Sequence, residues 1–195
     1  MKERPILFSA PMVRAILEGR KTMTRRAVRI PNWQDNETER TKLLIDGIKK
    51  GFPKCPYGKP GDRLWVRETF TESSSGVIYR ADPMFDHCKK GDISWKWKPS
   101  IFMPRKFSRI TLEITNVRVE RLQDITEDDA DDEGVEICGY DQLFGCPYYK
   151  NYQGGKPFYC GGKDSFKSLW ESINGPASWS TNPFVWVVEF KRVEK

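Results

Sequence analysis

Histidine is nearly absent from this 195-residue chain, which contains only His87. Its five cysteines form no Cys-x-x-Cys pair, and their odd number argues against a disulfide framework, so we expect free thiols. Cys138, Cys146 and Cys160 share one Gly/Tyr-rich segment, which leaves a structural zinc site as an alternative. With so little histidine we expect no metal and no other cofactor, and histidine-based cleavage is disfavoured.

Long apolar runs are also missing. No stretch of about 18 apolar residues occurs, which excludes a transmembrane helix. The N-terminal segment Met-Lys-Glu-Arg-Pro-Ile-Leu-Phe-Ser lacks the apolar core of a signal peptide. We therefore expect a cytoplasmic protein with no membrane partner.

The charge is positive overall and unevenly distributed. The formal net charge is +6, and residues 1–30 hold eight basic side chains against two acidic ones. Residues 126–133 hold six acids and no base. A basic N-terminal region beside a separate acidic helix favours a polyanionic partner or a site of mixed charge.

The length and the hydrophobic pattern predict one domain over residues 1–195, with insertions at about 31–60, 81–106 and 135–164. Periodicity predicts strands at 5–8, 63–70, 77–80, 108–122 and 184–190, and helices at 9–18, 126–134 and 165–173. A further short helix is expected at 41–48. The segment 135–164 is expected to be irregular, without helices or strands. The helix at 165–173 is expected to bury Phe166, Leu169, Trp170 and Ile173.

The longest predicted strand changes its hydrophobic phase around Thr115-Asn116, which indicates a bulge or a bend. Bends of this kind close small barrels. The fold class predicted is α+β: a small mixed β-barrel of about five or six strands with two or three flanking helices.

The segment Gly19–Arg26 places a lysine, two threonines and three arginines directly after the first predicted helix. Glycine ends that helix, so we expect the cluster on a loop. A lysine beside hydroxyls and guanidinium groups suits an anionic or carbonyl-bearing ligand. A basic surface turn is the alternative interpretation.

These residues resemble a known family. The pattern Gly19-x-Lys21-x-x-Thr24-x-Arg26 is similar to the signature of the ASCH family, a branch of the PUA-like barrel superfamily. The resemblance continues, in order along the chain, through a Gly-Asp turn and strand (61–66), an acidic helix (122–133) and a closing strand (187–191). The sequences at 64–68 and 172–179 resemble the longer ASCH-type proteins common in prophages.

The resemblance implies a PUA-like barrel that faces RNA or a nucleoside. Small family members hydrolyse N4-acetylcytidine with a lysine, a threonine and a glutamate, which correspond here to Lys21, Thr24 and Glu133. Other members are reported as ribonucleases, so a ribonuclease that uses the same basic cleft is an alternative. A further alternative is a phage protein that binds a host protein and has no catalytic activity.

In the hydrolase interpretation Lys21 lies partly desolvated in a cleft, with its pKa lowered, and takes the proton of the Thr24 hydroxyl. Glu133 would protonate the departing amine. The structural alternatives are an exposed lysine, a threonine that bonds its own turn, and a solvated charge run.

Glu68 shares a strand face with Leu64 and Val66, so it points inward and needs a cation, which we expect to be Arg25, Arg26 or Lys21. It is a second catalytic candidate or else a rim ion pair. Arg25 and Arg26 are expected to bind phosphate or to orient the site, with one of them structural.

Trp95, Trp97 and Arg105 belong to a loop that also contains Lys96 and Lys98. Aromatic and basic side chains in alternation are typical of a base-stacking surface. They, together with Trp65, are therefore expected to bind the ligand. A loop that only covers a barrel edge is the alternative.

Overall fold

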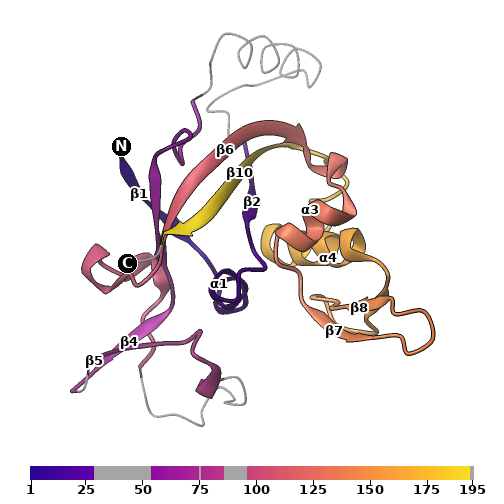
Figure 1. Ribbon diagram of the computed structural model, residues 1–195, viewed down its shortest axis with the longest axis horizontal. Helices are drawn as coiled ribbons and strands as arrows, with labels where there is room; N and C mark the ends of the chain where they lie inside the picture. The colour runs from indigo at the N-terminus through magenta and orange to yellow at the C-terminus, as the bar shows by residue number, and fades with distance from the viewer. Residues whose placement is uncertain (29–53, 75, 86–95, 194–195) are drawn as a thin grey trace.

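The computed structural model describes residues 1–28, 54–74, 76–85 and 96–193. Its centre is a five-stranded mixed sheet in the order β1-β3-β6-β10-β2 (Figure 1). The strands are β1 (Glu3–Leu7), β2 (Met23–Ala27), β3 (Arg63–Arg67), β6 (Thr111–Arg121) and β10 (Phe184–Val193). The β1–β3 pair is parallel and the other three pairs are antiparallel.

The two long strands β6 and β10 contain the expected irregularity. Their register shifts between Glu189 and Phe190, which pair with Asn116 and Ile114 and so leave Thr115 without a partner. The change of hydrophobic phase at Thr115-Asn116 thus marks a real bulge, because one extra residue reverses the face to which every later side chain points.

The sheet curves but does not close into a barrel. Among the described strands, the outer pair β1 and β2 each have one hydrogen-bonded neighbour. Between them a side chain makes the connection: Arg26 Nη2 on β2 donates to the Leu7 carbonyl oxygen at the end of β1, at 2.7 Å. The α+β class and the five-stranded mixed sheet match the expectation, whereas closure of the barrel is not seen.

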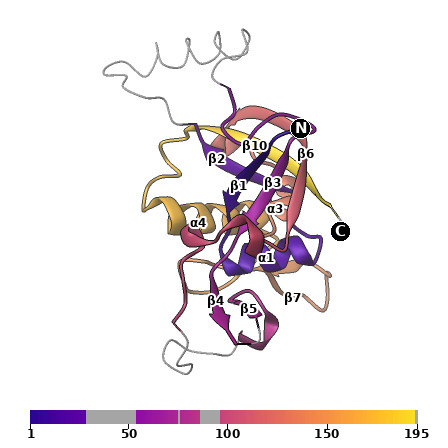
Figure 2. The ribbon, with the colours of Figure 1, turned by 90° about the vertical axis from the view of Figure 1, so that its left-hand side faces the viewer.

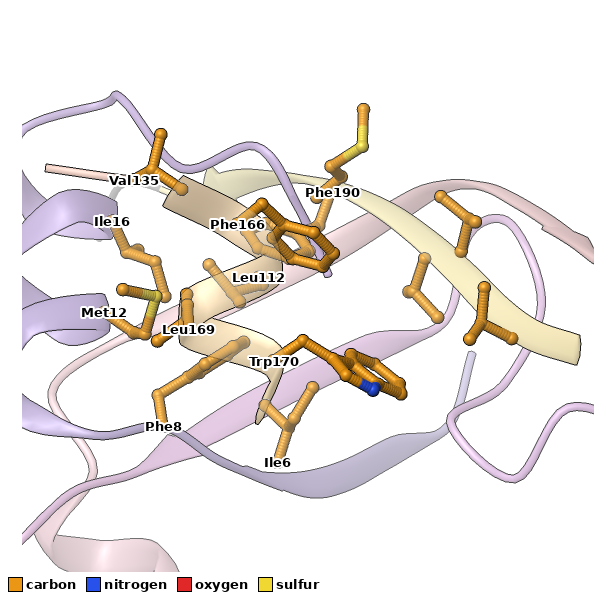
Figure 3. Close-up of a cluster of buried hydrophobic side chains, with 14 of the residues drawn as sticks. Ile6, Phe8, Met12, Ile16, Leu112, Val135, Phe166, Leu169, Trp170 and Phe190 are labelled. Carbon is orange, nitrogen blue, oxygen red and sulfur yellow. The ribbon is translucent and has the colours of Figure 1, made fainter. Parts of the chain in front are cut away.

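Three helices pack with the sheet: α1 (Ala10–Leu17), α3 (Glu127–Asp132) and α4 (Gly162–Asn174). Thr126 and Asp129 form the reciprocal capping box expected at the start of α3. Phe166, Leu169 and Trp170 project from α4 into the main hydrophobic cluster, which also contains Phe8 and Met12 of the β1–α1 region (Figure 3). Ile173 was expected in this core but is 64% exposed, because it lies in the last turn of α4.

Two smaller sheets lie outside the central sheet and apart from each other (Figures 1 and 2). One pairs β4 (Phe70–Ser73) with β5 (Gly76–Tyr79), and the other contains β7 (Ile137–Tyr140), β8 (Pro147–Tyr149) and β9 (Phe158–Tyr159). In the described part of the chain, short 3-10 helices occur at Pro83–Phe85, Ser100–Phe102, Arg105–Phe107 and Leu122–Asp124. The segment 135–164 is therefore more regular than expected.

The expectation that the cysteines are free thiols is wrong for one pair. Cys146 and Cys160 form a disulfide with their Cα atoms 5.6 Å apart. The reason is the pairing of β8 with β9, which aligns Tyr148 with Tyr159 and so brings the flanking cysteines together. Cys55 and Cys138 are free.

Several predictions fall on residues outside the described ranges: the helix at 41–48, most of the insertion at 31–60, and the positions of His87 and Trp95. Within the described ranges, no helix is both long enough and apolar enough to span a membrane.

Candidate functional site

The basic segment after α1 lies only in part on a loop. Gly19, at φ +77°, ends α1, and the chain then runs through Lys21 into β2. Thr24 and Arg25 pair with Val188 and Val187 of β10, so they belong to a strand and not to the expected loop. This pairing buries both side chains, because β2 lies against the core at this point.

Lys21 and Glu133 form a buried ion pair. The Lys21 Nζ donates to Glu133 Oε2 at 2.7 Å and to the Glu133 carbonyl oxygen at 2.6 Å. Their side chains are only 1% and 4% exposed. Glu133 is thus not part of a solvated charge run, and Lys21 is not an exposed lysine.

Gly134 makes the close approach of these two residues feasible. It follows α3 at φ +77°, and a Cβ added there would lie 2.8 Å from the Lys21 Cβ and 2.9 Å from the Ala15 Cβ. A side chain would therefore collide with both α1 and the lysine. Glycine allows the end of α3 to bring Glu133 onto Lys21.

Burial has a direct effect on the protonation of this pair. It lowers the pKa of the Lys21 ammonium; the attraction of Glu133 opposes that shift, and the nearby Arg26 and Arg25 charges add to it. Lowering the pKa increases the fraction of neutral amine at a given pH, which is the form that can accept a proton.

Arg25 is a structural residue. Its backbone N–H donates to Glu133 Oε1 at 2.6 Å, and its Nη2 contacts Asp129 at 2.9 Å and Glu120 at 3.2 Å. The side chain is 0% exposed. Of the two arginines expected at the site, Arg25 is thus the one whose charge is committed within the protein, where it ties β2 to β6 and α3.

Asp129 belongs to the same network. Burial alone would raise the pKa of its carboxyl, but the Thr126 backbone N–H and the charges of Arg25 and Arg118 outweigh burial and lower that pKa. Arg118 also contacts Glu120 and Glu189. These contacts fix the position of α3 on the sheet, and with it the position of Glu133.

A cavity of about 410 Å³ opens beside the Lys21–Glu133 pair. This is within the size range of small-ligand sites. Its charged side chains are Lys21, Arg25, Arg26 and Glu133, from β2, the residues before it and the residue that follows α3, and Thr24 lies among them. Ser9, Thr69, Ser100 and Asn174 are the other polar residues that line the cavity. Its apolar wall comes from the start of α1 and from α4 and includes Phe8, Met12, Phe166, Leu169, Trp170 and Ile173.

The floor of the cavity is more deeply buried than its edge. Lys21, Thr24 and Glu133 are each 3% exposed, whereas Ile173 is 64% exposed. No described residue makes a hydrogen bond to the Thr24 hydroxyl, so it is not the turn-bonding threonine of the structural alternative. The structure therefore brings Lys21, Thr24 and Glu133 together on one wall of a ligand-sized space.

Glu68 is not among the residues that line this cavity, and the prediction that Arg25, Arg26 or Lys21 pairs with it is wrong. Arg109 holds it with two parallel bonds of 2.9 Å and also contacts Asp82 at 2.6 Å. Burial raises the pKa of Glu68 and Arg109 opposes that rise. Glu68 does not line the cavity, and the guanidinium of its partner Arg109 lies over the ring of Tyr79 in β5 at 4.0 Å. The structure thus supports the ion-pair alternative for Glu68.

The aromatic candidates also lie apart from the cavity wall. Trp65 has the guanidinium groups of Arg67 and Arg105 at 5.2 and 5.9 Å from its ring. Trp97 packs edge-on against Phe85 at 5.3 Å. The structure does not bring Trp65, Trp97 or Arg105 to the Lys21 cavity, and Trp95 lies outside the described residues.

Phe8 contacts the cations of the site, a role that was not predicted from the sequence, and α4 was predicted only as a core helix. The Phe8 ring lies 5.6 Å from Lys21 Nζ and 5.4 Å from the Arg26 guanidinium carbon. Its apolar neighbours gave it the appearance of a simple core residue. Its position two residues before the first helix was the available signal, since strand-to-helix junctions often line sites.

Within the part of the chain that the structure describes, no three His, Cys, Asp or Glu side chains are arranged to hold a metal ion. No family model, no curated protein and no solved structure matches the chain.

Proposed function

We propose that the cavity binds a modified nucleoside and that the protein hydrolyses an N4-acyl cytidine, with Thr24 as nucleophile and Lys21 as base. The observation that carries this proposal is that Thr24 and the buried Lys21 line the same cavity wall. Membership of the ASCH family is part of the proposal, because its motif residues from two distant segments line the same space.

In the first half of the reaction, the Thr24 hydroxyl proton moves to Lys21 and then to the leaving nitrogen. Thr24 Oγ attacks the acyl carbonyl carbon, and Lys21 takes the hydroxyl proton. The bond from carbon to N4 breaks, and Lys21 passes the proton to the departing nitrogen, which gives cytidine and an ester on Thr24. Lys21 then takes a proton from an attacking water and passes it to Thr24 Oγ as the ester bond breaks, which restores the Thr24 hydroxyl. The carboxylic acid leaves and releases its proton to solvent as the carboxylate.

Glu133 serves this scheme best as a positioning residue. Its two carboxylate oxygens accept from Lys21 and from the Arg25 backbone N–H, an arrangement suited to the ionised form. Protonated, it would lose an acceptor site at one of these contacts. Lys21 is then the proton donor to the leaving nitrogen, a role assigned to Glu133 from the sequence.

The ribonuclease alternative is less favoured by the geometry. It requires several cations free to face a scissile phosphate. Of the three in the cavity wall, Arg25 is bound to carboxylates with no exposed side-chain surface, and Lys21 is paired with Glu133. The apolar wall from α1 and α4 suits a base and its acyl group better than a charged backbone.

The test is turnover of N4-acetylcytidine by the wild type, by Lys21→Met and by Arg20→Met, with RNA degradation measured in parallel. Arg20→Met removes one positive charge from the next residue, whose side chain is 41% exposed. We expect turnover by the wild type and by Arg20→Met and none by Lys21→Met. Turnover that survives in Lys21→Met, or RNA cleavage without deacylation, contradicts the proposal.

A further inference from the structure

Arg26 is the cation of the cavity wall that has no carboxylate partner among the described residues. Lys21 is paired with Glu133, and Arg25 with Asp129 and Glu120. Among the described residues, no carboxylate lies within ion-pair distance of Arg26. A guanidinium that lines a cavity without a counter-charge favours a ligand that brings one.

The orientation of Arg26 is nevertheless fixed. Its Nη2 donates to the Leu7 carbonyl oxygen at 2.7 Å, and its guanidinium carbon lies 5.4 Å from the Phe8 ring centre. Its Nε–H is closed off from solvent and has no acceptor among the described residues. The protein thus holds this guanidinium in place without using all of its donors.

Its position relative to Lys21 defines which part of a ligand it would meet. Lys21, Thr24 and Glu133 are buried, while Arg26 is only partly buried and donates to the carbonyl oxygen of Leu7, which is 43% exposed. A ligand whose acyl group reaches Thr24 would therefore present its opposite end to Arg26.

We infer that the site takes a nucleotide, and that Arg26 binds the phosphate monoester of an N4-acylated cytidine 5′-monophosphate at the cavity edge. This inference rests on the proposed function for the identity of the base and the acyl group. The phosphate contact itself is independent of catalysis, since it requires only binding.

The experiment measures kcat/KM for N4-acetylcytidine, for its 5′-monophosphate and for an oligoribonucleotide that contains N4-acetylcytidine. For the wild type we expect the monophosphate to be preferred over the nucleoside by about tenfold to a hundredfold, the effect of one or two charge-assisted hydrogen bonds. In Arg26→Met this preference should vanish, so that kcat/KM becomes similar for nucleotide and nucleoside, and Arg26→Lys should keep part of it. Arg20→Met, which removes the same charge outside this cavity, should retain the preference.

Calorimetric binding of cytidine 5′-monophosphate and of cytidine separates this inference from the proposed function. If no variant shows turnover but the monophosphate binds more tightly than cytidine and Arg26→Met removes the difference, the phosphate site stands and the hydrolase fails. Equal affinity for the two ligands overturns the phosphate site. So does an equal loss of turnover on nucleoside and nucleotide in Arg26→Met, which would place Arg26 at the reacting carbonyl, or a clear preference for the oligoribonucleotide.

Discussion

Glu133 and Glu68 are two buried carboxylates with opposite surroundings. Glu133 is 3% exposed and Glu68 is 1% exposed, and each is held by a basic side chain at hydrogen-bond distance. Glu133 lies beside a cavity and is paired with a lysine. Glu68 lies away from that cavity and is paired with an arginine in a bidentate arrangement.

The difference shows that a buried carboxylate is not by itself a sign of a reactive site. Lysine can lose its proton when burial lowers its pKa, whereas arginine keeps its charge at any pH that a protein tolerates. The Lys21 pair therefore suits proton transfer next to a bound ligand. The Arg109 pair suits attachment of the segment around Asp82 to β3.

The largest expected effect comes from replacing each basic residue with the other type, Lys21 with arginine and Arg109 with lysine. Lys21→Arg keeps the charge beside Glu133 but removes the base, so deacylation should fall by at least about a hundredfold. Arg109→Lys should leave kcat/KM within about twofold, since it touches no part of the cavity. Assays of N4-acetylcytidine turnover, with circular dichroism of both variants to confirm folding, provide the measurement. Near-normal turnover in Lys21→Arg would remove Lys21 from the role of base.

The Arg109–Glu68 pair should affect stability and leave turnover unchanged. Glu68→Gln leaves Arg109 without its bidentate partner and should lower the free energy of unfolding by about 3 kcal/mol, at the low end for a broken buried pair because Arg109 is 28% exposed. Its turnover should be unchanged below the melting temperature. The control is Glu72→Gln, which breaks the exposed pair with Lys98 and should cost about 0.5 kcal/mol or less. Urea unfolding gives both values, and similar costs for the two variants would show that the Arg109 pair does not stabilise the fold.

The close approach at Gly134 can be separated from its backbone conformation. Gly145→Ala places a side chain at φ +66° with nothing within 4 Å, so it should cost only the conformational strain, about 1 kcal/mol. Gly134→Ala has a similar φ of +77° but meets Lys21 and Ala15, so it should cost about 1–3 kcal/mol more. Turnover should fall in Gly134→Ala alone. Equal costs in urea unfolding would mean that α3 and Lys21 have room to separate.

The pH dependence of turnover reports on Lys21. Since the neutral amine is the active form, log kcat/KM should rise by about one unit per pH unit below the pKa of Lys21 and level off above it. Burial places that midpoint below the ordinary value for lysine. Glu133→Gln removes the charge that opposes the shift, so the midpoint should move further down, whereas Glu68→Gln should leave it unchanged. A midpoint in the ordinary lysine range, or one that moves in Glu68→Gln, disagrees with this assignment.

Features governed by neighbouring residues could be predicted from the sequence. The capping box at Thr126 and Asp129 spans three residues, and the bulge at Thr115 appears as a reversal of alternation within one strand. β2 could not be predicted in this way. Its residues Met23–Ala27 do not alternate, and the strand is set by pairing with β10, more than 150 residues along the chain.

The same limit applies to the partners of charged groups. Glu68 could be placed on the inward face of its strand, but no local pattern pairs it with Arg109, which lies 41 residues away at the start of the strand predicted at 108–122. The contact between Lys21 and Glu133 spans 112 residues and was anticipated only through the family resemblance. The disulfide of Cys146 and Cys160 likewise depends on the pairing of β8 with β9.

The most direct test of the catalytic claim is the hydroxyl of Thr24. Thr24→Val keeps the size and branching of the side chain and removes only the nucleophile, and Thr24→Ser keeps the hydroxyl and removes the methyl group. With N4-acetylcytidine at saturating concentration, kcat should be lost in Thr24→Val and largely retained in Thr24→Ser, while cytidine binds both variants. Turnover by Thr24→Val at the wild-type rate would contradict the account.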